Sequence, residues 1–142
     1  MTDFSGEAEA LFRRVAERRA LNIEPQASAD GDVMFALSSP DQSGDPVFVG
    51  LQRDDELSFT VGDFGASFFP AGSVKGLFEK AAEGWFTGQT RLAYYWRGKR
   101  LVKICMQVKL KSGNWQRIYT QYTTWILPFL TIKTTYKLHP NT

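Results

Sequence analysis

The side chains that most enzymes use for acid–base or nucleophilic chemistry are scarce in this chain. His139 is the only histidine and Cys105 the only cysteine among 142 residues. A histidine general base would have to be His139, and one histidine with one cysteine does not make a typical zinc site. The chain also lacks a phosphate-binding glycine loop and a dinucleotide fingerprint. The scarcity of these residues favours a protein that is not an enzyme, and it predicts no cofactor and no metal.

The sequence around Cys105 allows two interpretations of its role. It lies in sequence between Lys103 and Gln107, and nearby cations favour a reactive thiolate. The simpler interpretation is a small side chain that fills a half-buried position in a sheet, and we prefer it.

Acidic residues near turns form another candidate set. Two carboxylates brought together in space could serve acid–base chemistry or bind a hard cation. Asp30-Gly31-Asp32 nevertheless lacks the terminal glutamate of a calcium-binding loop, and turn formation with solvation explains the set well. Its members are Asp30, Asp32, Asp41, Asp45, Asp54, Asp55, Glu56 and Asp63.

The charges are strongly segregated along the chain, although the net charge is only +2. Seven basic and 15 acidic residues up to position 90 give −8, and ten basic residues without any acid from Arg91 onward give +10. An excess of this kind points to an anionic partner, unless the two halves neutralise each other within one molecule.

The strand that the sequence predicts most clearly is Leu101–Leu110, because its even positions are all apolar and its odd positions are mostly polar. We predict that Lys111-Ser112-Gly113 is a three-residue hairpin loop with Gly113 in the left-handed conformation. Trp115–Ile126 would then pair with Leu101–Leu110, and one face of the hairpin would carry cations, an amide and aromatic rings. That face is our candidate binding site; it comprises Lys103, Gln107, Lys109, Trp115, Arg117 and Tyr119, and the nearby turn adds Arg97, Lys99 and Arg100.

The predicted register of this hairpin is specific. Lys109 opposes Trp115, and Gln107 opposes Arg117. Further along, Cys105 is expected to oppose Tyr119, and Lys103 to oppose Gln121.

Two helices are predicted from apolar residues that recur every three or four positions, over Phe4–Leu21 and Val74–Trp85. Further strands are predicted from alternation and turn signals, with Thr131–Leu138 as a short edge strand. They are Val33–Ser39, Val47–Gln52, Leu57–Val61 and Thr90–Trp96.

The order predicts a single α+β domain over residues 1–142: a mainly antiparallel sheet of six to seven strands with two amphipathic helices, α-βββ-α-βββ(β). The longest apolar run, Trp125–Leu130, is interrupted by Pro128 and too short to span a membrane. A single thiol and no signal-peptide pattern favour a cytoplasmic location. The oligomeric state cannot be predicted.

Three functions are consistent with these patterns. The leading hypothesis is a non-enzymatic protein that binds an acidic protein partner through the basic, aromatic-bearing face. The second is binding of single-stranded nucleic acid by the same face, since lysines meet phosphates and rings stack on bases. The third is a small-molecule binder or enzyme with a pocket between sheet and helices, lined by Phe64, Phe78, Trp85 or Tyr94.

Overall fold

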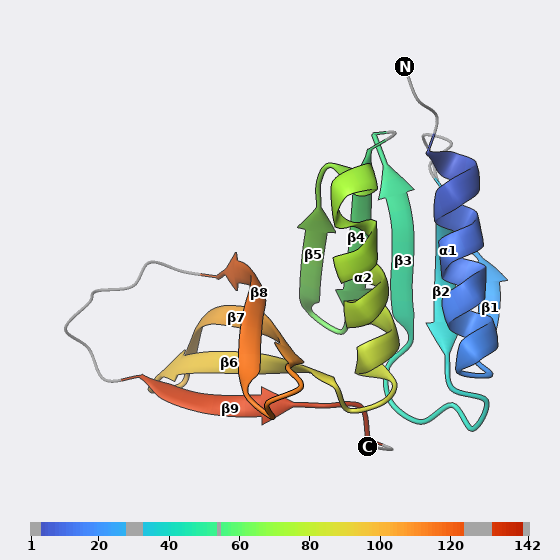
Figure 1. The fold of residues 1–142 in the computed structure, drawn as a ribbon. Coiled ribbons are helices and arrows are strands. Elements are labelled where there is room, and N and C mark those ends of the chain that lie inside the picture. The colour runs from blue at the N-terminus through green and yellow to red at the C-terminus, as the bar shows by residue number, and fades with distance from the viewer. Residues whose placement is uncertain (1–3, 28–32, 54, 124–131, 141–142) are drawn as a thin grey trace. The chain divides into compact units, whose positions relative to one another are not determined.

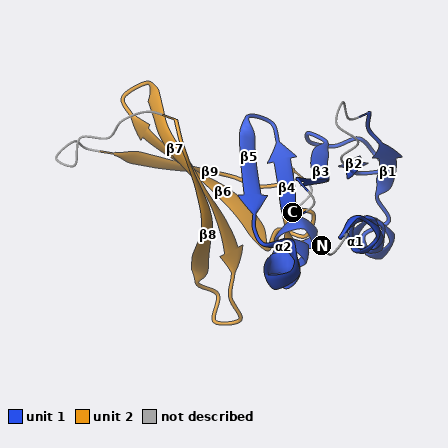
Figure 2. Ribbon diagram, turned by 90° about the horizontal axis from the view of Figure 1, so that it is seen from above, with its two compact units in different colours: residues 1–83 blue, residues 84–142 orange. Residues whose placement is uncertain are grey.

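The computed structural model describes residues 4–27, 33–53, 55–123 and 132–140. Its contacts divide the chain into two compact units, residues 1–83 and residues 84–142, coloured separately in Figure 2. The prediction of one domain over residues 1–142 stays a prediction. Each unit has a β-sheet of its own, and we describe the units separately.

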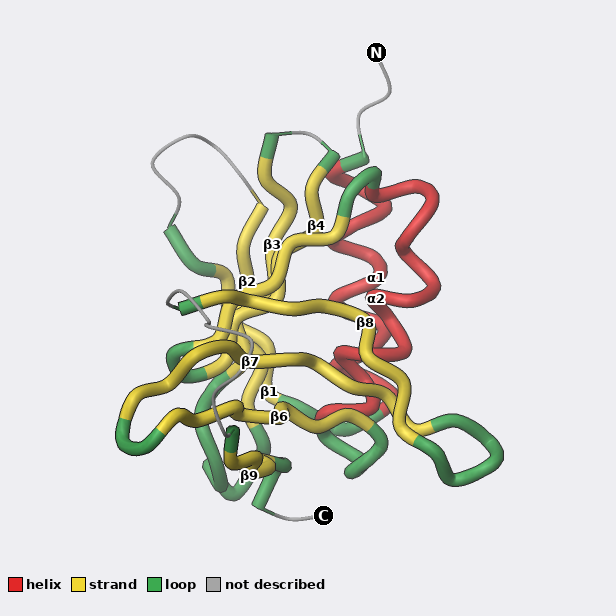
Figure 3. The backbone as a smooth tube through the Cα atoms, turned by 90° about the vertical axis from the view of Figure 1, so that its left-hand side faces the viewer, coloured by secondary structure: helices red, strands yellow, loops and turns green. Residues whose placement is uncertain are grey.

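The first unit pairs a layer of helices with a layer of strands (Figures 1 and 3). Its sheet has five antiparallel strands in sequential order, β1-β2-β3-β4-β5. The two helices lie on the same face of this sheet. The bounds are α1 Ser5–Arg18, β1 Asn22–Pro25, β2 Val33–Ser38, β3 Val47–Gln52, β4 Glu56–Val61, β5 Phe64–Phe68 and α2 Ala71–Trp85.

Phenylalanine rings join the helices to the sheet in the core of this unit. Phe12 on α1 has its ring centroid 6.1 Å from that of Phe35 on β2 and 5.9 Å from that of Phe78 on α2. Phe78 in turn meets Phe68 on β5 edge to face, at 5.5 Å. All four side chains are at most 5% exposed. The predicted packing of both helices on an antiparallel sheet is therefore present within this unit.

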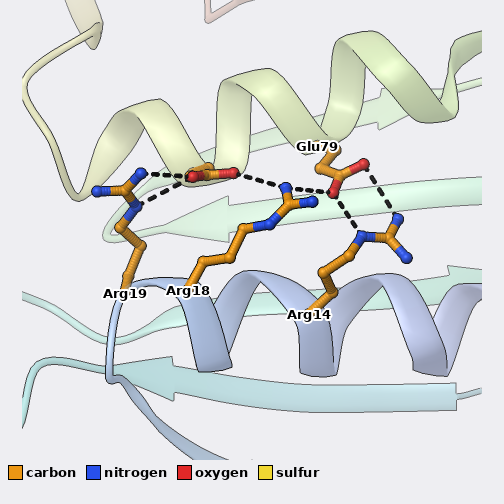
Figure 4. A network of polar contacts seen from close by, with 5 residues as sticks. Arg14, Arg18, Arg19 and Glu79 are labelled. Carbon is orange, nitrogen blue, oxygen red and sulfur yellow. Dashed lines mark hydrogen bonds and ion pairs between the residues drawn. The ribbon is translucent and has the colours of Figure 1, made fainter.

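Ion pairs join the exposed faces of the two helices (Figure 4). Arg14 donates two hydrogen bonds to Glu79, from Nε at 2.7 Å and from Nη2 at 3.1 Å. Arg18 donates to Glu79 at 2.9 Å and to Glu83 at 3.3 Å, and Arg19 donates twice to Glu83. The hydrogen bond from Arg14 is the main reason that the pKa of Glu79 lies below its usual value. Three arginines of this unit are thus matched by acids of the same unit.

The second unit contains a four-stranded antiparallel sheet in the order β8-β7-β6-β9. The even positions of β7, which the sequence predicts to be buried, are at most 1% exposed at Val102, Ile104, Met106 and Val108. The predicted edge strand is present as β9. The bounds are β6 Thr90–Arg97, β7 Arg100–Lys109, β8 Trp115–Tyr122 and β9 Lys133–Lys137.

The antiparallel pairing was predicted correctly, but the number of strands was underestimated and the strands form two sheets rather than one. The structure has nine strands in two sheets among its described residues, where six to seven in one sheet were expected. Strand β1 was missed because it is four residues long, mostly exposed and ends at Pro25. Strand β5 was missed because Gly62-Asp63 is a tight hairpin turn, with Gly62 at φ +57°, and not the end of the sheet.

Helix bounds differ by a few residues. The first helix ends at Arg18 rather than Leu21, because Ala20 adopts a positive φ of 53°. The second helix begins at Ala71 rather than Val74.

Some of the predictions fall on residues outside the described ranges. They are the strand end at Ile126, the strand start at Thr131, the apolar run Trp125–Leu130 and the turn Asp30-Gly31-Asp32. No helix within the described ranges is long and apolar enough to cross a membrane.

Candidate interaction surface

The change of charge along the sequence coincides with the boundary between the two units. Every Asp and Glu of the chain lies at or before Glu83, and the second unit begins at Gly84. The second unit therefore carries ten Lys and Arg residues and no acidic side chain. No lysine or arginine of this unit can find a carboxylate side chain inside it.

Pairing across β9, β6, β7 and β8 places cations, an amide and rings on one face of the second sheet. Residues directly opposite each other on antiparallel strands point to the same side. Arg91 opposes Gln107, which opposes Arg117, and Tyr95 opposes Lys103. We call this surface the basic face; it comprises Arg91, Tyr95, Lys103, Gln107, Lys109, Trp115, Arg117, Tyr122 and Tyr136.

The loop end of the predicted hairpin is confirmed. Gly113 has a φ of +91°. The amide of Leu110 donates to the carbonyl of Asn114 at 2.7 Å, which closes the three-residue loop. The predicted pairs of Lys109 with Trp115 and of Gln107 with Arg117 are both present.

Beyond these pairs the predicted register was wrong by one residue. The register shifts between Met106 and Gln107, where β8 accommodates Ile118 as an extra residue. Tyr119 consequently opposes Met106, on the other face, instead of Cys105. Tyr119 is therefore not part of the basic face.

The same shift brings different residues onto the basic face. Thr120 now opposes Cys105, and Tyr122 opposes Lys103 in place of Gln121. Tyr122 is 67% exposed, so the bulge places an exposed tyrosine where the amide of Gln121 was expected.

Arg91 is the centre of the basic face, although it was not among the predicted site residues. Its guanidinium carbon lies 4.1 Å from the centroid of the Trp115 ring and 3.9 Å from that of Tyr136. Its Nε donates a hydrogen bond of 2.7 Å to Oε1 of Gln107. Two rings and one amide from three other strands thus fix the guanidinium in place.

A second cation lies on a ring nearby. The ammonium nitrogen of Lys103 is 4.8 Å from the ring centroid of Tyr95. Burial raises the pKa of Tyr95, and nearby Arg117 and Arg91 oppose that rise. The Tyr95 phenol therefore remains neutral in this cationic surrounding at ordinary pH.

The turn cations extend the surface at the Lys103 end of the sheet. Arg97 opposes Arg100 across the β6–β7 turn, where Gly98 has a φ of +61°. Lys99 and Arg100 are exposed and Arg97 is half-buried. At the other end of β7, Lys109 is exposed beside Trp115.

The two side chains considered for catalysis, Cys105 and His139, are both buried. Cys105 is 0% exposed, with its Sγ 3.4 Å from Oγ1 of Thr120. His139 is 3% exposed, and its ring lies 5.3 Å from that of Phe86. Among the described residues, no three His, Cys, Asp or Glu side chains are grouped as a metal would require. The simpler interpretation of Cys105 placed it at a half-buried position of the sheet, whereas the structure buries it fully.

The predicted pocket residues are also buried. Phe64, Phe78, Trp85 and Tyr94 are at most 9% exposed. A groove of about 300 Å³ exists elsewhere, between α1 and α2 in the first unit. It is lined by Phe4, Glu7, Ala10, Leu11, Arg14, Lys75, Gly76 and Glu79, and by none of the four predicted residues.

Comparison with protein-family models, with curated proteins and with solved structures gave no significant match for this chain.

Proposed function

We propose that this protein is a non-enzymatic binding protein that takes an acidic protein partner on its basic face. The observation that carries the proposal is the composition of the second unit, which has ten basic side chains and no acidic one. Complementary charge speeds association and excludes partners of like charge. The cytoplasm, favoured by cysteine usage, is the proposed compartment.

The residue types on the basic face suit a protein interface. Arginine, tyrosine and tryptophan are the types enriched in binding hot spots. Arg117 and Lys109 are exposed, and Tyr136 and Tyr122 keep 51% and 67% of their surface. The face therefore combines cations at its rim with rings that can be covered by a partner.

The contacts of the rings favour an acidic protein over single-stranded nucleic acid. A nucleic-acid platform needs ring faces on which bases can stack. Here Trp115, Tyr136 and Tyr95 each hold a cation of the protein against their ring. Rings used in this way position positive charge for carboxylates and offer less surface to bases.

A charge-reversal experiment tests the proposal. The variant Lys103→Glu/Arg117→Glu changes two cations of the basic face, and the control Arg53→Glu/Lys80→Glu makes the same change of charge on exposed residues of the first unit. Each is used as bait for cross-linking in an extract of the cells that produce the protein, with mass spectrometry of the captured sites. We expect Asp- and Glu-rich segments to be captured by the wild type and the control but not by the basic-face variant.

Nucleic acid is tested in parallel. Equal capture by both variants, or no capture by the wild type, contradicts the proposal. Loss of capture after nuclease treatment, together with micromolar binding of single-stranded DNA or RNA that weakens steeply with salt, shows that nucleic acid is the ligand instead.

A further inference from the structure

We infer that Arg91 is a preformed fork for one carboxylate of the acidic partner, so that the basic face recognises geometry as well as charge. The inference rests on the proposed function and deepens it. It begins from the three contacts that hold the Arg91 guanidinium, namely the rings of Trp115 and Tyr136 and the amide oxygen of Gln107.

Only one of the N–H donors of the Arg91 guanidinium has a hydrogen-bond partner in the part of the chain that the structure describes. A guanidinium has five N–H donors in one plane, and the Nε–H of Arg91 is used by Gln107 at 2.7 Å. The terminal nitrogens Nη1 and Nη2 have no hydrogen-bond partner within the part of the chain that the structure describes. Nη1 and Nη2 together can still pair with a carboxylate end-on, through two parallel hydrogen bonds.

The rings lower the entropic cost of such a pair. A long arginine side chain loses rotamer freedom when it binds, and this loss normally opposes a surface ion pair. Arg91 has already lost that freedom, because two rings and the Gln107 amide hold it before any ligand arrives. Arg91 is also half-buried, so its charge is less screened than that of an exposed lysine.

Neighbouring donors extend the site across the sheet. Gln107 accepts from Arg91 through Oε1, so this contact does not use its Nε2 donors. Arg117 opposes Gln107 on the next strand. With strands about 4.8 Å apart, Arg91 and Arg117 start about 10 Å apart on either side of an amide donor. The row Arg91–Gln107–Arg117 presents donors and no carboxylate.

A substitution that keeps the charge of Arg91 distinguishes recognition by a planar guanidinium from recognition by positive charge alone. Arg91→Lys leaves the net charge unchanged but replaces the planar fork with a point charge. Arg13→Lys is the matched control, because Arg13 also lies over a ring, that of Phe35 at 5.2 Å, but belongs to the first unit. The probe is a fluorescently labelled, end-blocked decaglutamate peptide, and its affinity for the full chain is measured by anisotropy at 50 and 150 mM salt.

We expect Arg91→Lys to weaken decaglutamate binding about 10-fold and Arg13→Lys to leave it unchanged. A second variant, Gln107→Glu, places a carboxylate at the Nε–H of Arg91, where it neutralises the guanidinium charge that the partner would otherwise meet. It is expected to reduce binding at least as much, while Lys80→Gln, with the same change of charge on the first unit, has little effect. Far-ultraviolet circular dichroism checks the fold, and Gln107→Glu decides the question if Arg91→Lys does not fold.

The outcomes separate the two proposals. If Arg91→Lys and Gln107→Glu both bind like the wild type while Lys103→Glu/Arg117→Glu does not bind, the fork is refuted and the basic face stands. If the wild type fails to bind decaglutamate at 50 mM salt, both proposals are refuted. Equal weakening by Arg91→Lys and Arg13→Lys also refutes the fork, since only one of these arginines lies on the basic face.

Discussion

Substitution of Glu79 by glutamine tests how the two helices of the first unit are held together. The Glu79 side chain is only 20% exposed, while those of Arg14 and Arg18 are 45% and 50% exposed. Glu79 accepts two hydrogen bonds from Arg14, at 2.7 and 3.1 Å, and one from Arg18, at 2.9 Å. Glutamine keeps the shape but removes the charge that makes these bonds strong.

The expected loss follows from the exposure of the partners. An exposed ion pair contributes about 0.2–1 kcal/mol, and a bidentate pair within a network lies at the upper end of that range. With both arginines half-exposed, we expect Glu79→Gln to lower the free energy of unfolding by about 1–2 kcal/mol near pH 7. Glu9→Gln is the control, because Glu9 and Arg13 are about half-exposed at 3.7 Å, and its effect should stay below about 0.5 kcal/mol.

The pH dependence has a definite sign. The pKa of Glu79 is lower in the folded protein than its usual value of 4.5, mainly because of the hydrogen bond from Arg14. A carboxyl group of this kind contributes stability above the unfolded pKa and loses it as the pH falls through the folded value. Urea unfolding followed by circular dichroism should therefore show the difference between wild type and Glu79→Gln at pH 7 and a shrinking difference below pH 4.5. A difference that is absent at pH 7, or unchanged at pH 3.5, would show that the ion pairs of Glu79 do not stabilise this unit.

Three glycine substitutions test the packing and the turn. On α2, Gly76→Ala should raise the free energy of unfolding by about 0.5–1 kcal/mol, because nothing lies within 4 Å of the added carbon. In the same helix, Gly84→Ala should lower it by about 1–3 kcal/mol, because the carbon overlaps Oγ1 of the fully buried Thr90. Gly113→Ala should cost about 1 kcal/mol through its φ of +91°. Urea unfolding of the three variants checks these signs, and a stabilised Gly84→Ala contradicts the packing.

Strand periodicity made the hairpin of the second unit predictable from sequence. Alternation along β7 identified Val102 and Met106 as buried. The parity of the first pairs followed from the cost of placing Arg117 on the apolar face, which favours a three-residue loop. The bulge at Ile118 was missed, because a single extra residue leaves no periodic signal in a strand. Tyr119 was placed on the wrong face for that reason alone.

The centre of the basic face was only partly accessible to sequence reasoning. Arg91 and Tyr95 are four residues apart on one strand, and alternation from the buried Leu92 could have placed both on the polar side. The contact of Arg91 with Trp115 and Tyr136 could not be predicted, because it depends on which distant strands flank β6. Charge segregation was visible in the sequence, but its coincidence with the boundary at Gly84 required the structure.

A map of where an acidic ligand binds on the full chain tests most directly whether the basic face is the binding site. We would titrate the uniformly ¹⁵N-labelled protein with unlabelled decaglutamate and follow the backbone amides and the arginine side-chain signals. We expect the shifts to concentrate on β6, β7 and β8, around Arg91, Gln107 and Arg117, with the Nη protons of Arg91 becoming resolved. Shifts concentrated in residues 4–83, or no shifts at all, would contradict this expectation.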